Sequence, residues 1–205
     1  MVRLGFWAAL ILFLGGLAYA AAVAVGMVWY GLHRPIGDPV LAVMEILTLL
    51  LAPLTIVMMV AIHTDALPEH KTNTLIAVAF AVLLTGVTTT VHFVELTALR
   101  QLGSASLAWP SPLYAAELLA WDVFLGLSLL FAAPAFKGDR LRNTVRRTMI
   151  FSGSMCVLGV LGPFTGDLRY QFIAVVGYGI VFPAVCLFLA LLFGRSHTIR
   201  PARTA

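Results

Sequence analysis

Six long apolar stretches, separated by short polar connections, limit what this chain can fold into. A helix needs about 20 apolar residues to cross a bilayer, and none of the six has the alternating pattern of a barrel strand. The sequence therefore predicts an all-α fold: a polytopic membrane helical bundle of six transmembrane helices, forming one domain over residues 1–205. The expected spans are 5–29, 40–63, 74–99, 113–135, 146–165 and 170–193.

The composition agrees with a multi-pass protein of the cell (inner or plasma) membrane. Hydrophobic residues make up 61% of the chain, charged residues 11%, and the mean hydropathy is +0.99. Soluble domains are about half apolar and about a quarter charged. The net charge of +4 is no nucleic-acid signature, because the basic residues lie between apolar stretches. Membrane lipids are the expected partners, and the sequence leaves the oligomeric state open.

The basic residues predict the orientation. In a six-span topology, Arg34, Arg100 and Arg169 fall on one side and the other ten fall on the opposite side, together with both termini. Those ten are Arg3, Lys71, Lys137, Arg140, Arg142, Arg146, Arg147, Arg195, Arg200 and Arg203. Because basic residues concentrate in cytoplasmic connections, we expect both termini in the cytoplasm.

The first stretch has an alternative interpretation. Arg3, an apolar run and then Ala18-Tyr19-Ala20 resemble a signal peptide with a cleavage site. The apolar run continues to Trp29, so we expect a retained first helix.

A polar stripe marks the third stretch. Thr85, Thr88, His92 and Glu95 are spaced three, four and three apart, which places them on one helix face. Such a stripe should face other helices or a wet cavity rather than lipid. In the expected topology, Glu45, Glu117 and Asp122 fall in the same outer half of the bilayer. We therefore expect one shared, partly polar cavity there.

Each of these residues also has a structural interpretation. Glu95 and Arg100 could form an interfacial ion pair, Glu117 could reach the lipid headgroups, and His92 could be a packing residue. Asp122 differs, because it lies deep, beside Trp121, with no basic residue within a helical turn. An ionised carboxyl there costs several kcal/mol, so Asp122 should be paired or protonated.

Several kinds of site are excluded. The lysines, Lys71 and Lys137, lie in connections, so a retinal Schiff base has no partner. The chain has no CxxC pair, no Gly-rich phosphate loop and no DDxxD-type motif for magnesium-pyrophosphate. Only one histidine accompanies the acids, so we expect neither a metal site nor a cofactor.

What remains is acid–base chemistry on a lipophilic small molecule. A protonated, membrane-embedded Asp122 can protonate an alkene or an epoxide, aromatic faces can stabilise the resulting cation, and a second group can remove the final proton. The candidate catalytic residues are Asp122, Glu95, His92, Glu117 and Glu45. The candidate substrate-binding residues are Trp121, Phe93, Phe124, Tyr114, Thr88, Tyr178 and Gln171.

The dipeptide Trp121-Asp122 in an apolar helix resembles the Trp-Glu pair of the small integral-membrane terpene cyclases of fungal and actinobacterial meroterpenoid pathways. The resemblance implies a compact helical bundle that starts the cyclisation or isomerisation of an isoprenoid by protonation. The chain departs from the fungal pattern in having Asp for Glu and six expected spans for the usual seven.

Two other functions are compatible with the sequence. A bundle with one polar vestibule could bind or move a small lipophilic molecule or protons, although we find no internal repeat and no midplane site. An accessory subunit with a structural polar cluster is the third possibility. A cavity that opens sideways to lipid would favour the enzyme, and a path through the bundle would favour transport.

Overall fold

The computed structural model describes residues 2–31, 36–102 and 109–199, with side chains up to residue 195. Within these ranges the structure is helical and contains no strand. Six helices are long and apolar enough to cross a membrane: Val2–Tyr30, Val40–Asp65, Pro68–Leu102, Pro112–Ala135, Arg140–Thr165 and Gln171–Arg195. Each boundary lies within about six residues of the boundary expected from the hydropathy pattern.

Two of these helices are uninterrupted and four are built from shorter elements. The first two are α1 (Val2–Tyr30) and α2 (Val40–Asp65). The third contains η1 (Pro68–His70), α3 (Lys71–Val94), η2 (Glu95–Leu99) and α4 (Arg100–Leu102). The fourth contains α5 (Pro112–Leu118), η3 (Leu119–Leu125), α6 (Gly126–Ala132) and η4 (Ala133–Ala135). The fifth joins α7 (Arg140–Gly159) to α8 (Leu161–Thr165), and the sixth joins α9 (Gln171–Val176), η5 (Gly177–Val181) and α10 (Phe182–Ile199).

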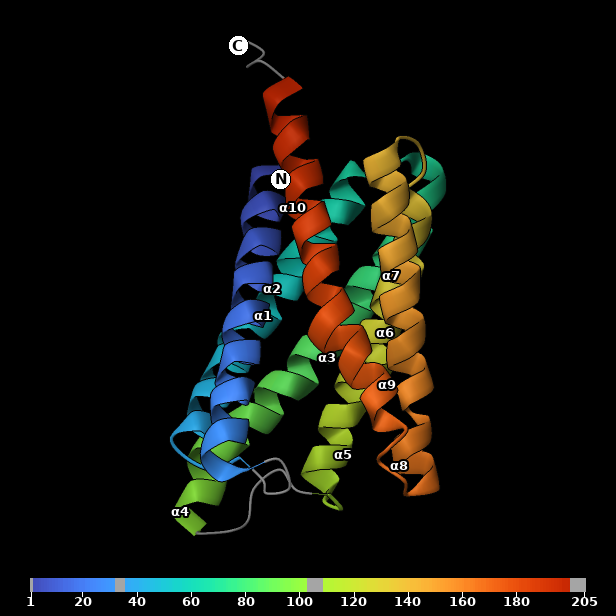
Figure 1. The fold of residues 1–205 in the computed structure, drawn as a ribbon. Coiled ribbons are helices and arrows are strands. Elements are labelled where there is room, and N and C mark those ends of the chain that lie inside the picture. Colours follow the sequence, from blue (N-terminus) through green and yellow to red (C-terminus); the bar gives the residue numbers. More distant parts are fainter. Residues whose placement is uncertain (1, 32–35, 103–108, 200–205) are drawn as a thin grey trace.

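The helices form one bundle, in which the start of α1 and the end of α10 lie at the same end (Figure 1). We call this the terminal end; it also carries the α2–α3 and η4–α7 connections. The other end, here called the opposite end, carries α4, the start of α5 and the α8–α9 connection. In the bundle α1 packs on α2 and α10, α2 packs on α3, and α7 packs on α6, α9 and α10.

Local signals fix where two of the helices begin. Ser111 caps α5 by accepting a hydrogen bond from the Tyr114 backbone N–H at 3.1 Å, and Pro112 occupies the first turn. Asp139 caps α7 in the same way, accepting from the Arg142 backbone N–H at 2.9 Å. These caps set the axial positions of the two helices, and α5 leads directly into the segment that carries Glu117 and Asp122.

The terminal half of the bundle is packed with apolar side chains. Met58, Leu129, Met149 and Leu189 are fully buried there. Large apolar side chains also cover the outside, as at Leu50, which is 66% exposed. An exterior this apolar suits a lipid environment better than water.

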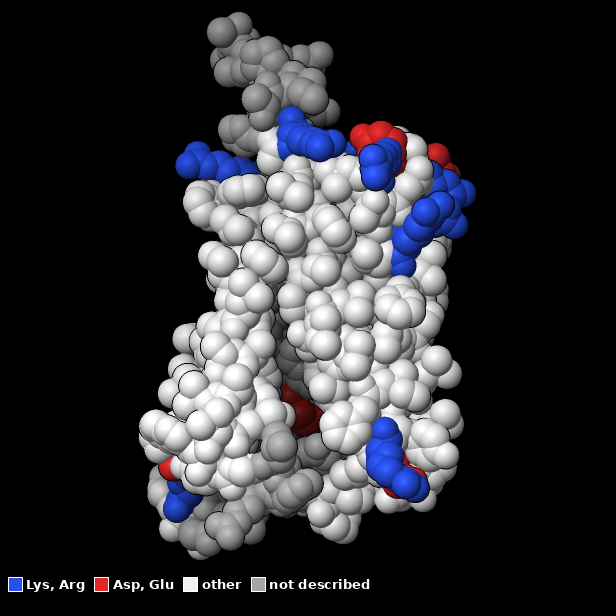
Figure 2. All heavy atoms as spheres, in the orientation of Figure 1, with Lys and Arg blue, Asp and Glu red and all other residues white. Residues whose placement is uncertain are grey.

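The described basic residues gather at the terminal end (Figure 2). Arg100 and Arg169 belong to the opposite end; the other eight are Arg3, Lys71, Lys137, Arg140, Arg142, Arg146, Arg147 and Arg195. Arg34, Arg200 and Arg203, which also entered the sequence-based orientation, lie outside the described residues. The structure thus puts the start of α1 and the end of α10 at the basic end, and the side of the membrane on which that end lies remains a prediction.

Candidate functional site

The first polar cluster joins α3 to the fourth helix and is centred on the Glu117 carboxylate. Trp121 Nε1 donates to Glu117 Oε1 at 2.5 Å, and His92 Nε2 lies 3.0 Å from the same oxygen. The Thr88 hydroxyl lies 3.1 and 3.0 Å from the two carboxylate oxygens. The helix positions explain this arrangement: Thr88 and His92 are four residues apart on α3, and Glu117 and Trp121 are four apart on the facing helix.

His92 is held by this cluster on one side only. Its Nε2 faces Glu117, whereas its Nδ1 is buried and has no hydrogen-bond partner among the described residues. Thr88 is fully buried, and His92 is 7% exposed. A carboxylate with three donors and an imidazole with one open nitrogen form a pair that can accept and pass a proton.

The second cluster pairs Asp122 with Gln171. Gln171 Nε2 donates to Asp122 Oδ1 at 2.9 Å, and both residues are buried, Asp122 completely. Asp122 Oδ2 and Gln171 Oε1 have no hydrogen-bond partner among the described residues. The other acid of the fourth helix, Glu117, faces α3, so the two acids on this helix have separate partners.

The third cluster surrounds Arg100 at the opposite end. Its guanidinium contacts both Asp38 oxygens, through Nε at 2.9 Å and Nη2 at 2.8 Å, and its Nη1 donates to Glu45 Oε2 at 2.7 Å. Nη1 also lies 3.1 Å from the Glu95 backbone carbonyl. Hydrogen bonds from Arg100 lower the pKa of Asp38 below its ordinary value. Arg100 therefore ties the segment before α2, and α2 itself, to the end of the third helix.

Three π-helical segments lie in the half of the bundle that holds these clusters. They are η2, η3 and η5; Glu95 begins η2, Trp121 and Asp122 lie in η3, and Tyr178 lies in η5. The wider i→i+5 turn changes which side chains face inward, and π-segments are frequent at functional sites. Because candidate residues lie within these π-helical segments, the segments are the strongest local-structure sign of a functional site in this half.

Aromatic side chains lie beside both acids of the fourth helix. The rings of Trp121 and Tyr178 are 5.5 Å apart at 50°, and both are half-buried. Tyr114 interacts electrostatically with Asp122 and Glu117. Tyr19 of α1 interacts electrostatically with Glu117, Tyr114, Glu45 and Tyr178, so it belongs to the same surroundings.

Sequence reasoning missed Tyr19 as a site residue. It entered only as part of the possible cleavage site Ala18-Tyr19-Ala20. The available signal was a phenol in an otherwise apolar stretch, at a depth comparable to the acids of the other helices.

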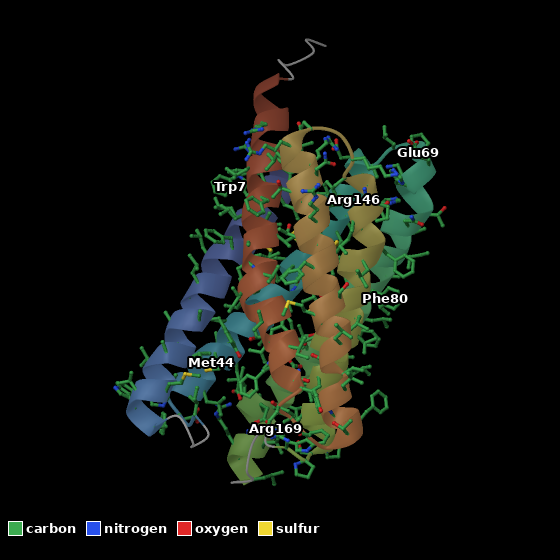
Figure 3. All side chains as sticks on the ribbon, turned by 45° about the vertical axis from the view of Figure 1, so that its right-hand side comes forward. Trp7, Met44, Glu69, Phe80, Arg146 and Arg169 are labelled. Carbon is green, nitrogen blue, oxygen red and sulfur yellow. The ribbon has the colours of Figure 1, made fainter. Side chains whose placement is uncertain are left out.

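Two of the expected aromatic residues lie elsewhere. Phe93 is 60% exposed on α3, and Phe124 stacks on Phe80 with ring centroids 6.3 Å apart. Figure 3 labels Phe80, on the third helix. Glu45 and Glu95 are both buried; the Glu45 carboxylate belongs to the Arg100 cluster, and Glu95 contributes its backbone carbonyl to that cluster.

A groove opens on the side of the bundle in the half toward the opposite end. Figure 2 shows it between α1 and the α9–α10 segment, with an acidic side chain at its floor. The Glu117 side chain is 13% exposed, so it can be reached from outside the protein. This opening faces sideways, toward the environment of the apolar surface.

Among the described residues, no group of three or more His, Cys, Asp or Glu side chains is arranged to hold a metal ion. The chain matches no protein-family model, no curated protein and no solved structure. Any function must therefore be argued from the site itself.

Proposed function

We propose that the chain is a multi-pass protein of the cell membrane, with both termini cytoplasmic, and that it is an acid–base enzyme acting on a lipophilic, isoprenoid-type substrate. The substrate enters the lateral groove from the outer leaflet. The support for the orientation is the accumulation of basic residues at the terminal end.

The proposal rests on the Asp122 carboxyl. It is fully buried, and its one hydrogen bond among the described residues comes from the neutral amide of Gln171. An ionised carboxylate with so little compensation costs several kcal/mol, whereas a protonated carboxyl does not. Since Oδ1 accepts from Gln171, the proton belongs on Oδ2, which has no partner among the described residues. Asp122 is thus an acid whose proton is not engaged by the surrounding protein.

The remaining groups complete a proton cycle. Asp122 Oδ2 gives its proton to an alkene carbon or an epoxide oxygen, leaving a cationic carbon on the substrate. The faces of Trp121 and Tyr178 stabilise that charge, since aromatic rings attract cations. Glu117, supported by His92, removes a proton from a neighbouring carbon and closes the new double bond. One proton enters the substrate and one leaves it, so the product is a cyclised or isomerised form of the substrate. A proton then returns to Asp122, with His92 and Glu95 as the return path, and the enzyme is reset.

The test is turnover of a panel of prenylated substrates by purified protein in bilayer nanodiscs. Asp122→Asn keeps the side-chain volume and removes the acid, so we expect turnover to fall about 100- to 10,000-fold, the range of general acid catalysis. Asp122→Glu restores an acid and should keep part of the activity. The matched control is Glu69→Gln, an exposed acid at the terminal end, which should leave turnover unchanged.

Two outcomes would reject parts of this proposal. Full activity of Asp122→Asn would exclude Asp122 as the acid and transfer that role to Glu117 or Glu95. Absence of turnover by the wild type, together with an isoprenoid in its lipid extract, would favour a protein that binds or transports a lipophilic molecule.

A further inference from the structure

A second cavity lies at the terminal end, far along the bundle from the acids. It has a volume of about 270 Å³ and is lined by Arg3, Phe6 and Trp7 of α1 and Gly194 of α10. Its lining thus combines two aromatic rings, a glycine and one guanidinium. The acid–base site uses none of these residues, so the two sites are independent.

The packing of α1 against α2 and α10 explains why a cavity forms here. At Gly5 a Cβ would lie 2.6 Å from Ala61 Cβ and 3.0 Å from the Phe193 ring, so the backbones are close at this level. At Gly194 a Cβ would meet only Phe6, at an ordinary 3.5 Å. The missing side chain at Gly194 therefore leaves room beside Phe6.

The aromatic wall is suited to the boundary between acyl chains and headgroups. The rings of Phe6 and Trp7 meet edge to face at 5.2 Å, and Trp7 is 49% exposed. Figure 3 labels Trp7 near the terminal end of α1. Tryptophan is enriched at this level of membrane proteins, because its ring is apolar and its N–H is polar.

Two arginines give this cavity a positive charge that can bind an anion. Arg3 lines it, and Arg195 follows Gly194 directly; both side chains are exposed. Neither arginine takes part in the ion pairs found between described residues. A guanidinium binds phosphate oxygens through two parallel hydrogen bonds, so two of them beside an apolar groove match a phosphate attached to an acyl chain.

We propose that this cavity binds one anionic phospholipid from the leaflet at the terminal end. Arg3 and Arg195 hold the headgroup phosphate, and an acyl chain lies along Phe6 and Trp7 over Gly194. The inference rests on membrane insertion but not on the acid–base chemistry.

The experiment is native mass spectrometry of the full chain in detergent, titrated with phosphatidylglycerol and, separately, with phosphatidylcholine of the same chains. We expect the wild type to prefer the anionic lipid. Removing one basic side chain near a membrane surface should weaken that preference about fivefold, so Arg3→Gln and Arg195→Gln should each show this loss. Gly194→Leu should reduce binding of the first lipid by filling the groove, since its Cβ is tolerated.

The control is Arg169→Gln, which removes an exposed arginine at the opposite end and should leave the preference unchanged. Glycerol phosphate, which has no acyl chain, should not compete. An unchanged preference in the Arg3→Gln, Arg195→Gln double variant would overturn the proposal, as would an equal loss in Arg169→Gln. Because the arginines are exposed and unpaired with described acids, these variants test the site even if Gly194→Leu fails to fold.

Discussion

The two halves of the bundle are built on different principles. The half toward the terminal end has a dry interior of Met58, Leu129 and Met149 and a strongly basic surface. The half toward the opposite end buries acids and a histidine and contains all three described π-helical segments. The same helices run through both halves, so the difference lies in which side chains they present inward. The terminal half stabilises the helix packing, and the half toward the opposite end shields reactive side chains from lipid.

Close packing explains how the terminal half can support the other. In lipid, helices gain little from burying apolar side chains, so association depends on close contact and shared hydrogen bonds. A Cβ at Gly126 would lie 3.0 Å from the Gly153 carbonyl oxygen, which shows how near α6 and α7 approach. Ser128 adds a hydrogen bond across to the Ala77 carbonyl of α3 at 2.8 Å. The fourth helix is thereby fixed on the terminal side of the segment that carries Asp122.

The largest expected change in stability comes from the dry half. Leu129→Ala removes a fully buried side chain, and we expect it to lower the free energy of unfolding by about 2 kcal/mol, the low end for a buried leucine. The low end applies because the gain from leaving water is smaller in a bilayer. The measurement is the midpoint of SDS-induced unfolding. Leu50→Ala, at a 66% exposed position, is the control and should change stability by less than about 0.5 kcal/mol.

Equal effects of these two substitutions would show that the interior of the terminal half is not packed as described. The two halves would then not differ in the way described, even if the acids take part in catalysis.

The next effect concerns the Glu117 cluster. Glu117→Gln removes the charge and the basic carboxylate but leaves one oxygen, which can still accept from His92 and Trp121 because both contact Oε1. We expect turnover to fall about 100-fold or more, as for loss of a general base, with a smaller change in stability. Thr88→Val is the matched comparison, because it removes one neutral donor from the same carboxylate and should affect turnover less.

A second readout separates chemistry from structure in this experiment. A base role predicts that the pH dependence of turnover changes in Glu117→Gln but not in Thr88→Val. If both variants lose activity equally with unchanged pH profiles, Glu117 serves only to pack α3 against the fourth helix.

The sequence predicted the all-helical fold and the six apolar helices, because the length and hydropathy of a span are local properties. It also indicated buried polar residues such as Asp122, since an isolated carboxyl in an apolar run must find a partner. It did not predict the partner of each residue. His92 lies three residues before a π-helical segment that begins at Glu95, and the structure pairs it with Glu117 of another helix.

The sequence analysis placed side chains on a common face from regular α-helical spacing. That spacing does not hold within π-helical segments, where the turn is wider. No sequence pattern that we used marks such segments, so η3 and η5 were not expected. The positions of Phe93 and Phe124, expected among the substrate-binding residues, could not be predicted either, because both faces of α3 and of the fourth helix are rich in apolar residues. Which apolar face meets protein and which meets lipid depends on tertiary packing.

The smallest expected effect lies at the rim of the polar half, where Asp38 meets Arg100. Asp38 has a lowered pKa, so its ion pair adds stability above the ordinary value of 3.8, and that stability is lost as the pH falls through the lowered value. The Asp38 side chain is 52% exposed, which limits the contribution of the pair to between 0 and about 1 kcal/mol. Asp38→Asn removes the charge but keeps an oxygen for the Ala42 backbone N–H, so it isolates the ion pair.

We therefore expect Asp38→Asn to unfold slightly earlier than the wild type at pH 5–7, and this difference to shrink as the pH falls below 3.8 and Asp38 becomes protonated. Asp167→Asn is the control: its partner Arg169 is two residues away, so that pair joins no separate helices and should not affect unfolding. A wild-type advantage that does not shrink as the solution is acidified would show that Asp38 acts through its backbone and not its charge. A loss of turnover without a loss of stability would show instead that the Arg100 cluster shapes the groove, and the rim would then belong to the site.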